Sequence, residues 1–203
     1  MFARTALGRT ALKACMPARF GSSRTADLCD KLKMDSYKCG AEKQVKIVDP
    51  AMNFRDFGGN KAFSGLVTTI KAYESNPMVR KVLEEEPGNG RVLVVDGGGS
   101  MRCGMFGDKI AKKGAENGWT GVIIYGCVRD SRGLGTLPLG VKALNTHPIG
   151  SHQEDQGVRD VPVVFGGVRI QPGQYIYADE DGIVVSDSAL EGWDLTDDWC
   201  GTV

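Results

Sequence analysis

The clearest hydrophobic pattern lies in the middle of the chain, where two short apolar runs enclose an amphipathic segment. Residues 92–95 are continuously apolar, which is typical of a strand buried on both faces. The next segment has apolar residues at helical spacing and lysines on the other side, and it predicts a helix that starts before Gly107 and ends near Gly118. Residues 121–128 form the second apolar run. This order predicts two parallel strands joined by a right-handed helical crossover.

Weaker patterns on both sides predict further short elements. Before the central unit we expect a capped helix near Thr25, strands at 45–48 and 63–70, and a helix at 76–86 with Pro77 in its first turn. After it, apolar segments lie at 161–165, 168–170, 174–178 and 182–186. Gly-Gly, Pro-Gly and Asp-Gly turns separate these segments, so they predict antiparallel hairpins. The fold class is therefore α/β.

Length and composition fit one domain preceded by a basic extension. The chain has 203 residues, of which 41% are hydrophobic, and this is enough for a single core. Residues 1–24 carry five Lys or Arg residues and no acidic residue. That composition is typical of a mitochondrial transit peptide, and a disordered basic extension is the alternative. We expect residues 25–203 to form one domain with an acidic C-terminal tail, in mitochondria or, without targeting, in the cytoplasm.

Charge and cysteine usage argue against several classes of protein. Lys plus Arg and Asp plus Glu each number 25, so the net charge is zero and direct nucleic-acid binding is disfavoured. No apolar stretch approaches the ~20 residues that cross a bilayer, so we expect no membrane association. The six cysteines include no Cys-x-x-Cys pair, which argues against a structural zinc site.

A glycine run follows the first central strand and resembles phosphate-binding loops only superficially. Residues 96–100 read Asp-Gly-Gly-Gly-Ser and predict a glycine-rich turn. The dinucleotide fingerprint fails because Arg102 stands at its third glycine, and the P-loop pattern fails because Met105 and Phe106 replace its Lys and Ser/Thr. Two interpretations stay open: a tight turn that passes close to a neighbouring segment, or a loop that binds a small anion.

The most informative pattern joins Gly107-Asp108 to Arg129-Asp130 across about twenty residues. A helix of about 11 residues descends ~16 Å, and a strand of about seven residues returns a little over 20 Å. The two motifs are therefore expected to meet at the carboxyl edge of the parallel strands, where open α/β sheets bind ligands.

These residue types suit an anionic ligand and a cation. A helix start at 107–110 offers free N–H groups to a carboxylate, and Arg129 can bind the same group in a bidentate manner. Asp108 and Asp130 supply oxygen ligands for magnesium or manganese. Taken alone, an Arg-Asp pair such as Arg129-Asp130 after a strand is more often a surface ion pair than a functional site, and the spacing alone does not change that.

Several segments together resemble the RraA-like family over about residues 25–186. They are Asp96-Gly-Gly-Gly-Ser100, the Gly107-Asp108 helix start, Ile124-Tyr-Gly-Cys-Val-Arg-Asp130, Leu139-Gly-Val-Lys-Ala-Leu144, Phe165-Gly-Gly-Val168 and Tyr177-Ala-Asp-Glu-Asp-Gly-Ile-Val184. The resemblance implies a three-layer β/β/α swivelling-type domain that assembles as homotrimers or hexamers. It also implies a class II aldolase that cleaves 4-hydroxy-4-methyl-2-oxoglutarate and related 2-oxo acids to pyruvate and decarboxylates oxaloacetate. The family's other activity is the alternative: a non-catalytic regulator that binds a ribonuclease or helicase.

The resemblance also implies roles for individual residues. Gly107, Asp108, Lys109 and Ile110 would surround the substrate carboxylate through backbone groups. Arg129 would bind the oxo-acid end, and Asp130 would hold Mg²⁺ or Mn²⁺, which makes Arg129, Asp108 and Asp130 the catalytic set.

The resemblance also bears on acidic residues at two further places in the chain. Some relatives have an acidic residue where this chain has Gly133. A further acidic group, from Glu191 or Asp194 of a neighbouring subunit, is expected to complete the site. The S-adenosylmethionine loop of a methyltransferase is not visible in the sequence.

Overall fold

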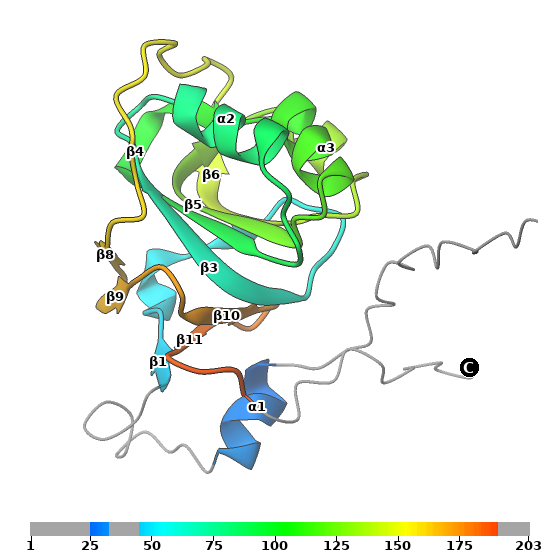
Figure 1. Cartoon of the computed structure of the whole chain (residues 1–203), viewed down its shortest axis with the longest axis vertical. Coiled ribbons are helices and arrows are strands. Elements are labelled where there is room, and N and C mark those ends of the chain that lie inside the picture. The colour runs from blue at the N-terminus through cyan, green and yellow to red at the C-terminus, as the bar shows by residue number, and fades with distance from the viewer. Residues whose placement is uncertain (1–24, 33–44, 191–203) are drawn as a thin grey trace, which may run out of the picture.

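Four parallel strands form the centre of the molecule (Figure 1). The computed structural model describes residues 25–32 and 45–190, so the basic extension, Glu191 and Asp194 lie outside the described residues. The central strands lie side by side in the order β3 (Phe63–Lys71), β4 (Val92–Phe106), β5 (Gly121–Val128) and β6 (Gly140–Thr146). The parallel β4–β5 pair expected from the two apolar runs is confirmed.

Antiparallel strands extend this sheet and form a second layer. The first half of β3 pairs with β10, so the sheet continues through β10 (Tyr175–Ala178), β11 (Ile183–Ser186) and β1 (Val45–Ile47). Two short strands pair at the central sheet: β2 (Arg55–Asp56) with β6, and β7 (Val158–Arg159) with β3. The hairpin of β8 (Val163–Phe165) and β9 (Val168–Ile170) is separate. The predicted hairpins are confirmed for β8–β9 and β10–β11, whereas β9 and β10, on either side of the Pro172-Gly173 turn, do not pair.

Helices cover the other face of the parallel strands (Figure 1). They are α2 (Pro77–Glu85) and α3 (Asp108–Glu116), and the short α4 (Ser131–Leu134) follows β5. The remaining helical segments are α1 (Thr25–Lys31) and the 3-10 turn η1 (Pro50–Met52). No helix in the described ranges is long and apolar enough to span a membrane. The order helices, parallel strands, antiparallel strands confirms the three-layer β/β/α fold.

Burial on both faces explains the apolar runs in the sequence. Leu93 and Val95 pack toward the helices, whereas Val92 and Val94 pack toward the antiparallel layer, and all four are fully buried. Because side chains alternate across a strand, a strand between two layers must be apolar at every position. Each such side chain contributes about 1.5–3 kcal/mol through its burial.

The glycine run is part of β4, so the predicted turn is wrong. Asp96 pairs with Tyr125 and Ser100 pairs with Gly126, and the three glycines between them bulge out of the ladder. Gly98 and Gly99 have φ of +68°. A Cβ on Gly98 would lie 2.7 Å from the Tyr73 ring, as expected of a close backbone approach.

Two other predictions need correction. Phe106 still pairs with Val128 in the sheet, so α3 begins at Asp108 and not before Gly107. Strand β6 was not predicted because Lys142 interrupts its apolar residues. In the structure Lys142 is buried and its ammonium group lies 2.9 Å from Asp56 Oδ1. A buried lysine interrupts the hydrophobic pattern on which strand prediction depends. The sequence does not indicate that a distant residue compensates its charge.

Candidate active site

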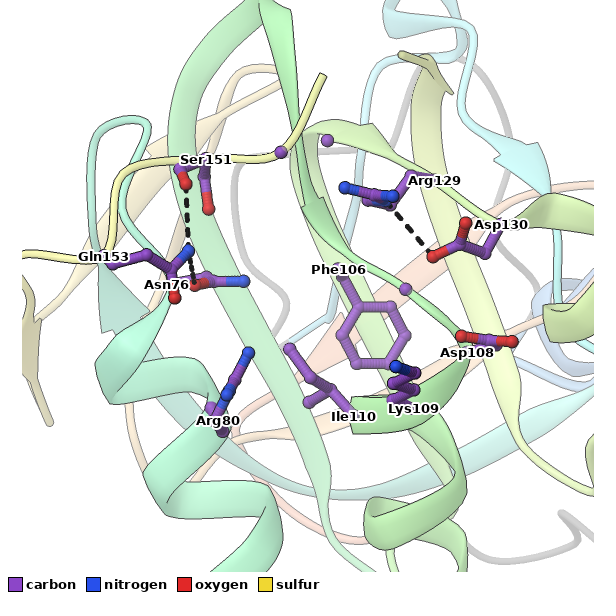
Figure 2. Close-up of a pocket in the computed structure, with 13 residues that line it drawn as sticks. Asn76, Arg80, Phe106, Asp108, Lys109, Ile110, Arg129, Asp130, Ser151 and Gln153 are labelled. Carbon is purple, nitrogen blue, oxygen red and sulfur yellow. Dashed lines mark hydrogen bonds and ion pairs between the residues drawn. The ribbon is translucent and has the colours of Figure 1, made fainter. Parts of the chain in front are cut away.

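A cleft of about 230 Å³ opens where β4 ends and α3 begins. Its walls come from the starts of α2 and α3, the end of β5, and the connection between β6 and β7 (Figure 2). Gly107, Asp108, Lys109, Ile110, Arg129 and Asp130 all line it. The expectation that the two motifs meet at the carboxyl edge of the parallel strands is therefore confirmed, while the roles of these residues stay predictions.

Backbone contacts explain why the two motifs meet. The backbone N–H of Arg129 donates to the carbonyl of Phe106 at 2.8 Å, so the end of β5 is tied to the residue before α3. A Cβ on Gly107 would lie 2.6 Å from Asp130 Oδ2. Glycine at this position therefore leaves room for the Asp130 carboxylate against the start of the helix.

Asp130 presents a carboxylate with spare hydrogen-bonding capacity. Its backbone is left-handed, with φ of 56°, at the N-cap position of α4, yet its side chain makes no capping bond. Left-handed backbone in a residue other than glycine costs free energy and often marks a functional position. The side chain is 41% exposed, and Arg129 Nε lies 3.2 Å from its Oδ2 (Figure 2). Its other carboxylate oxygen has no hydrogen-bond or ion-pair partner in residues 25–32 and 45–190.

Asp108 occupies the space that a side chain at position 133 would need. A Cβ on Gly133 would lie 2.8 Å from Asp108 Cβ and 2.9 Å from its Oδ2. Glycine at position 133 therefore leaves room for the Asp108 side chain beside the start of α4.

The start of α3 supplies backbone donors that have no partner in the described part of the chain. The intrahelical ladder begins with the N–H of Ala111, which donates to the carbonyl of Gly107 at 3.0 Å. The N–H groups of Asp108, Lys109 and Ile110 precede that ladder, and Gly107 has no side chain to cap them. Ile110 is only 5% exposed, so its contribution to a ligand is through the backbone. This geometry fits a bound carboxylate.

The charges of the cleft suit an anion together with a small cation. Arg80, Lys109 and Arg129 supply three positive charges, and Asp108 and Asp130 supply two negative charges. The described ranges contain no group of three or more His, Cys, Asp or Glu side chains that could hold a metal. Magnesium in proteins often uses one or two carboxylates and completes its coordination with water and substrate. The two carboxylates of the cleft fit that mode of binding.

Sequence reasoning did not identify the opposite wall. Asn76, Arg80, Ser151 and Gln153 line the same cleft from α2 and from the connection after β6 (Figure 2). They belong to no motif, and only tertiary contacts bring them to the start of α3. His147 and His152 also lie in that connection between β6 and β7.

Comparisons with known proteins agree with this fold. A family model described as RraA-like: Aldolase/RraA matches residues 25–185. Proteins of Aromatoleum aromaticum and Alkalilimnicola ehrlichii are each 53% identical over 82% of this chain and cover 98% and 96% of their own length. Both are provisionally named 4-hydroxy-4-methyl-2-oxoglutarate aldolases.

Two solved structures share the fold, each with a TM-score of 0.74. The RNA-processing inhibitor RraA from Thermus is 39% identical, covering 85% of this chain and 97% of its own. The other, from Geobacillus kaustophilus, is described as an S-adenosylmethionine:2-dimethylmenaquinone methyltransferase; it is 43% identical, covering 83% of this chain and 97% of its own.

Proposed function

The chain belongs to the RraA-like family, and from that premise we propose that it is a divalent-metal-dependent lyase that releases pyruvate from 4-hydroxy-4-methyl-2-oxoglutarate or a related 2-oxo acid. The observation that carries the proposal is the convergence of Asp108, Arg129, Asp130 and the start of α3 on one cleft. The aldolase names of relatives that are 53% identical support it.

Each part of the cleft has a task in this reaction. The N–H groups at the start of α3 bind the C1 carboxylate, and Arg129 donates to the C2 oxygen. Mg²⁺ or Mn²⁺ held by Asp130 would supply further stabilisation of the negative charge that develops on that oxygen. Asp108 accepts the proton of the C4 hydroxyl through a water molecule, because it lies in the cleft beside Asp130.

The electron pair then follows a simple path. Loss of the hydroxyl proton forms the new carbonyl at C4, and the C3–C4 bond breaks. The electrons of that bond move to C3 and C2, which gives the enolate of pyruvate with its charge on the oxygen bound by Arg129. Protonation at C3 completes pyruvate. Loss of carbon dioxide from oxaloacetate leaves the same enolate, so we propose oxaloacetate decarboxylation as a second activity of this site.

A regulatory function is the second candidate. The likeness to the RNA-processing inhibitor RraA, at 39% identity, favours an inhibitor of RNA processing, and the partner that we propose for that role is a ribonuclease or helicase. Methyl transfer has less support, because the glycine run is a bulge within β4 and not a loop that opens a helix. We also propose a closed homo-oligomer, trimer or hexamer, with the site completed by a neighbouring subunit. The relatives named above are bacterial, and mitochondrial import gains no support from them.

Pyruvate release tests the proposal directly. The full chain is incubated with 4-hydroxy-4-methyl-2-oxoglutarate or oxaloacetate, with Mg²⁺, with Mn²⁺ or with a chelator, and pyruvate is measured by coupled reduction. We expect metal-dependent release from both substrates. Release that persists in the chelator would contradict the metal requirement. No release under any condition, together with capture of a purified ribonuclease, would favour the regulator.

A further inference from the structure

The cleft has a second wall, to which the proposed reaction assigns no role. We call it the distal wall and define it as Asn76, Arg80, Ser151 and Gln153. It lies across the cleft from Asp108, Arg129 and Asp130, and Phe106 and Ile110 lie between the two walls (Figure 2). Two polar walls on opposite sides of one cleft suit a ligand with a polar group at each end.

Hydrogen bonds hold the amides of the distal wall in place. Asn76 Nδ2 donates to the carbonyl of Met105 at 3.1 Å, which ties α2 to the end of β4. Gln153 Nε2 donates to Asn76 Oδ1 at 3.4 Å and to the carbonyl of Ser151 at 3.0 Å (Figure 2). These bonds connect the start of α2 with the connection after β6, so the wall is preorganised.

Two donors of the distal wall have no acceptor within the described part of the chain. Arg80 lies one turn after Asn76, whose carbonyl accepts its N–H at 2.9 Å, and its guanidinium makes no ion pair there. Ser151 is nine-tenths buried, and its hydroxyl likewise has no hydrogen-bond partner. A buried hydroxyl without a partner is costly, and an unpaired guanidinium offers five donors to an anion. Both features indicate a missing acceptor.

The distal wall begins close to the substrate-binding arginine. The N–H of Gly104 donates to the carbonyl of Ile149 at 2.7 Å, which fixes the connection after β6 over the end of β4. A Cβ on the next residue, Gly150, would lie 3.0 Å from an Arg129 guanidinium nitrogen. A ligand held by Arg129 would therefore lie next to this connection, and Arg80 lies across the same cleft (Figure 2).

We propose that the distal wall binds a second carboxylate of the substrate, with Arg80 as the charged contact and Ser151 as a supporting donor. This inference rests on the proposed lyase function. It assigns the substrate class as 2-oxo acids whose second carboxylate lies on the carbon beyond the bond that breaks. In such a substrate the second carboxylate remains intact in the leaving product. Oxaloacetate differs, because its second carboxylate departs as carbon dioxide and needs no contact with Arg80.

Three substrates distinguish binding of a second carboxylate by Arg80 from a general role of Arg80 in catalysis. The dicarboxylic 4-hydroxy-4-methyl-2-oxoglutarate, the monocarboxylic 4-hydroxy-2-oxopentanoate and oxaloacetate all yield pyruvate. For Arg80→Ala we expect kcat/KM on the dicarboxylic aldol to fall about 10- to 100-fold, the range of a lost hydrogen bond to a charged group. Activity on the other two substrates should stay within about threefold of the parent. Ser151→Ala should lower only the first activity, by about three- to tenfold, without loss of thermal stability.

The matched control is Arg169→Ala, because Arg169 is an exposed arginine on β9, outside the cleft. It should leave all three activities unchanged. Equal losses on all three substrates in Arg80→Ala, or no loss on any, would overturn the proposal. If the parent itself releases no pyruvate, the lyase function fails, and calorimetry still decides the subsite. The parent should then bind 2-oxoglutarate more tightly than 2-oxobutanoate, and Arg80→Ala should remove that preference; equal binding would overturn it.

Discussion

Two carboxylates at the same edge of the sheet, Asp130 and Glu74, share a backbone conformation but differ in how their oxygens are used. Both are left-handed, with φ of 56° and 51°, and both contact an arginine. Ser100 Oγ donates to Glu74 at 2.6 Å, and two nitrogens of Arg102 lie 3.1 Å from its oxygens. The Asp130 carboxylate has only the contact at 3.2 Å with Arg129 within the described residues.

Their surroundings explain the difference. The Glu74 side chain is 7% exposed, and its carbonyl accepts from His152 N–H at 2.8 Å. It thereby joins the segment after β3, strand β4 and the connection after β6. The hydrogen bond from Ser100, with the nearby Arg102 charge, lowers the pKa of Glu74. A carboxylate whose oxygens are already bonded supports the fold, whereas Asp130, with an open oxygen in a cleft, is available to a ligand.

The largest effect is expected from Asp130→Asn. The substitution removes the anionic oxygen but keeps the shape, and Asn tolerates the left-handed backbone at this position. We expect Mn²⁺ affinity and both lyase activities to collapse, with kcat/KM lower by about a thousandfold. Circular dichroism and oligomer size should match the parent. Turnover within about threefold of the parent would show that Asp130 holds no metal and would move the regulator ahead of the lyase.

The next effect is expected from Arg129→Lys. Lysine keeps the charge but loses the planar fork that binds the substrate oxygen. We expect catalysis to fall about a hundredfold while Mn²⁺ binding, followed by titration, persists. If metal binding were lost as well, the two neighbouring residues would not have the separate tasks assigned to them.

A smaller effect should follow from Gly133→Ala, which extends the comparison to Asp108. The new methyl group would lie 2.8 Å from Asp108 Cβ, so it must displace the start of α3 or of α4. We expect kcat/KM to fall about tenfold, because small misplacements of catalytic groups are costly. Gly135→Ala in the same connection is the control, since its Cβ would meet nothing closer than 3.6 Å. Equal activity of the two variants would show that Asp108 tolerates displacement.

Glu74→Gln should lower stability and leave activity nearly unchanged, which is the opposite of what we expect from Asp130→Asn. The neutral amide loses the ion pair with Arg102 and places a donor against it, so we expect a lower midpoint of thermal unfolding. Pyruvate release well below that midpoint should stay within about threefold of the parent. Glu116→Gln is the control, because its ion pairs with Lys112 and Lys113 lie on the exposed face of α3 and should matter little. A greater loss of activity than of stability would place Glu74 in the site.

The smallest effect is a pH dependence. The folded-state pKa of Glu74 is lowered from its ordinary value of 4.5, chiefly by the Ser100 hydrogen bond. Its contribution to stability is therefore fully present above pH 4.5 and is lost as the pH falls through the lowered folded-state pKa. Ser100→Ala should weaken this dependence, which urea unfolding between about pH 3 and pH 7 can measure. Parallel curves for the variant and the parent would contradict this assignment.

The sequence alone determined the elements whose pattern is local. The runs at 92–95 and 121–128 lie in β4 and β5, and the periodic segment between them lies in α3. Burial between two layers and amphipathic spacing both appear as patterns of neighbouring residues, so they can be recognised in the sequence. Element lengths then placed Gly107-Asp108 beside Arg129-Asp130, because a helix and a strand of known rise bring the chain back to its starting edge.

Only the tertiary structure decided the features that depend on distant partners. Strand β6 contains the buried Lys142, whose charge is compensated by Asp56 from another strand. The glycine run became a bulge because β5 continues to pair with β4 beyond it. Arg80 and Ser151 lie 71 positions apart in the numbering yet share one wall. No local pattern encodes such pairs, since their contacts form only after strand order and crossovers have brought the segments together.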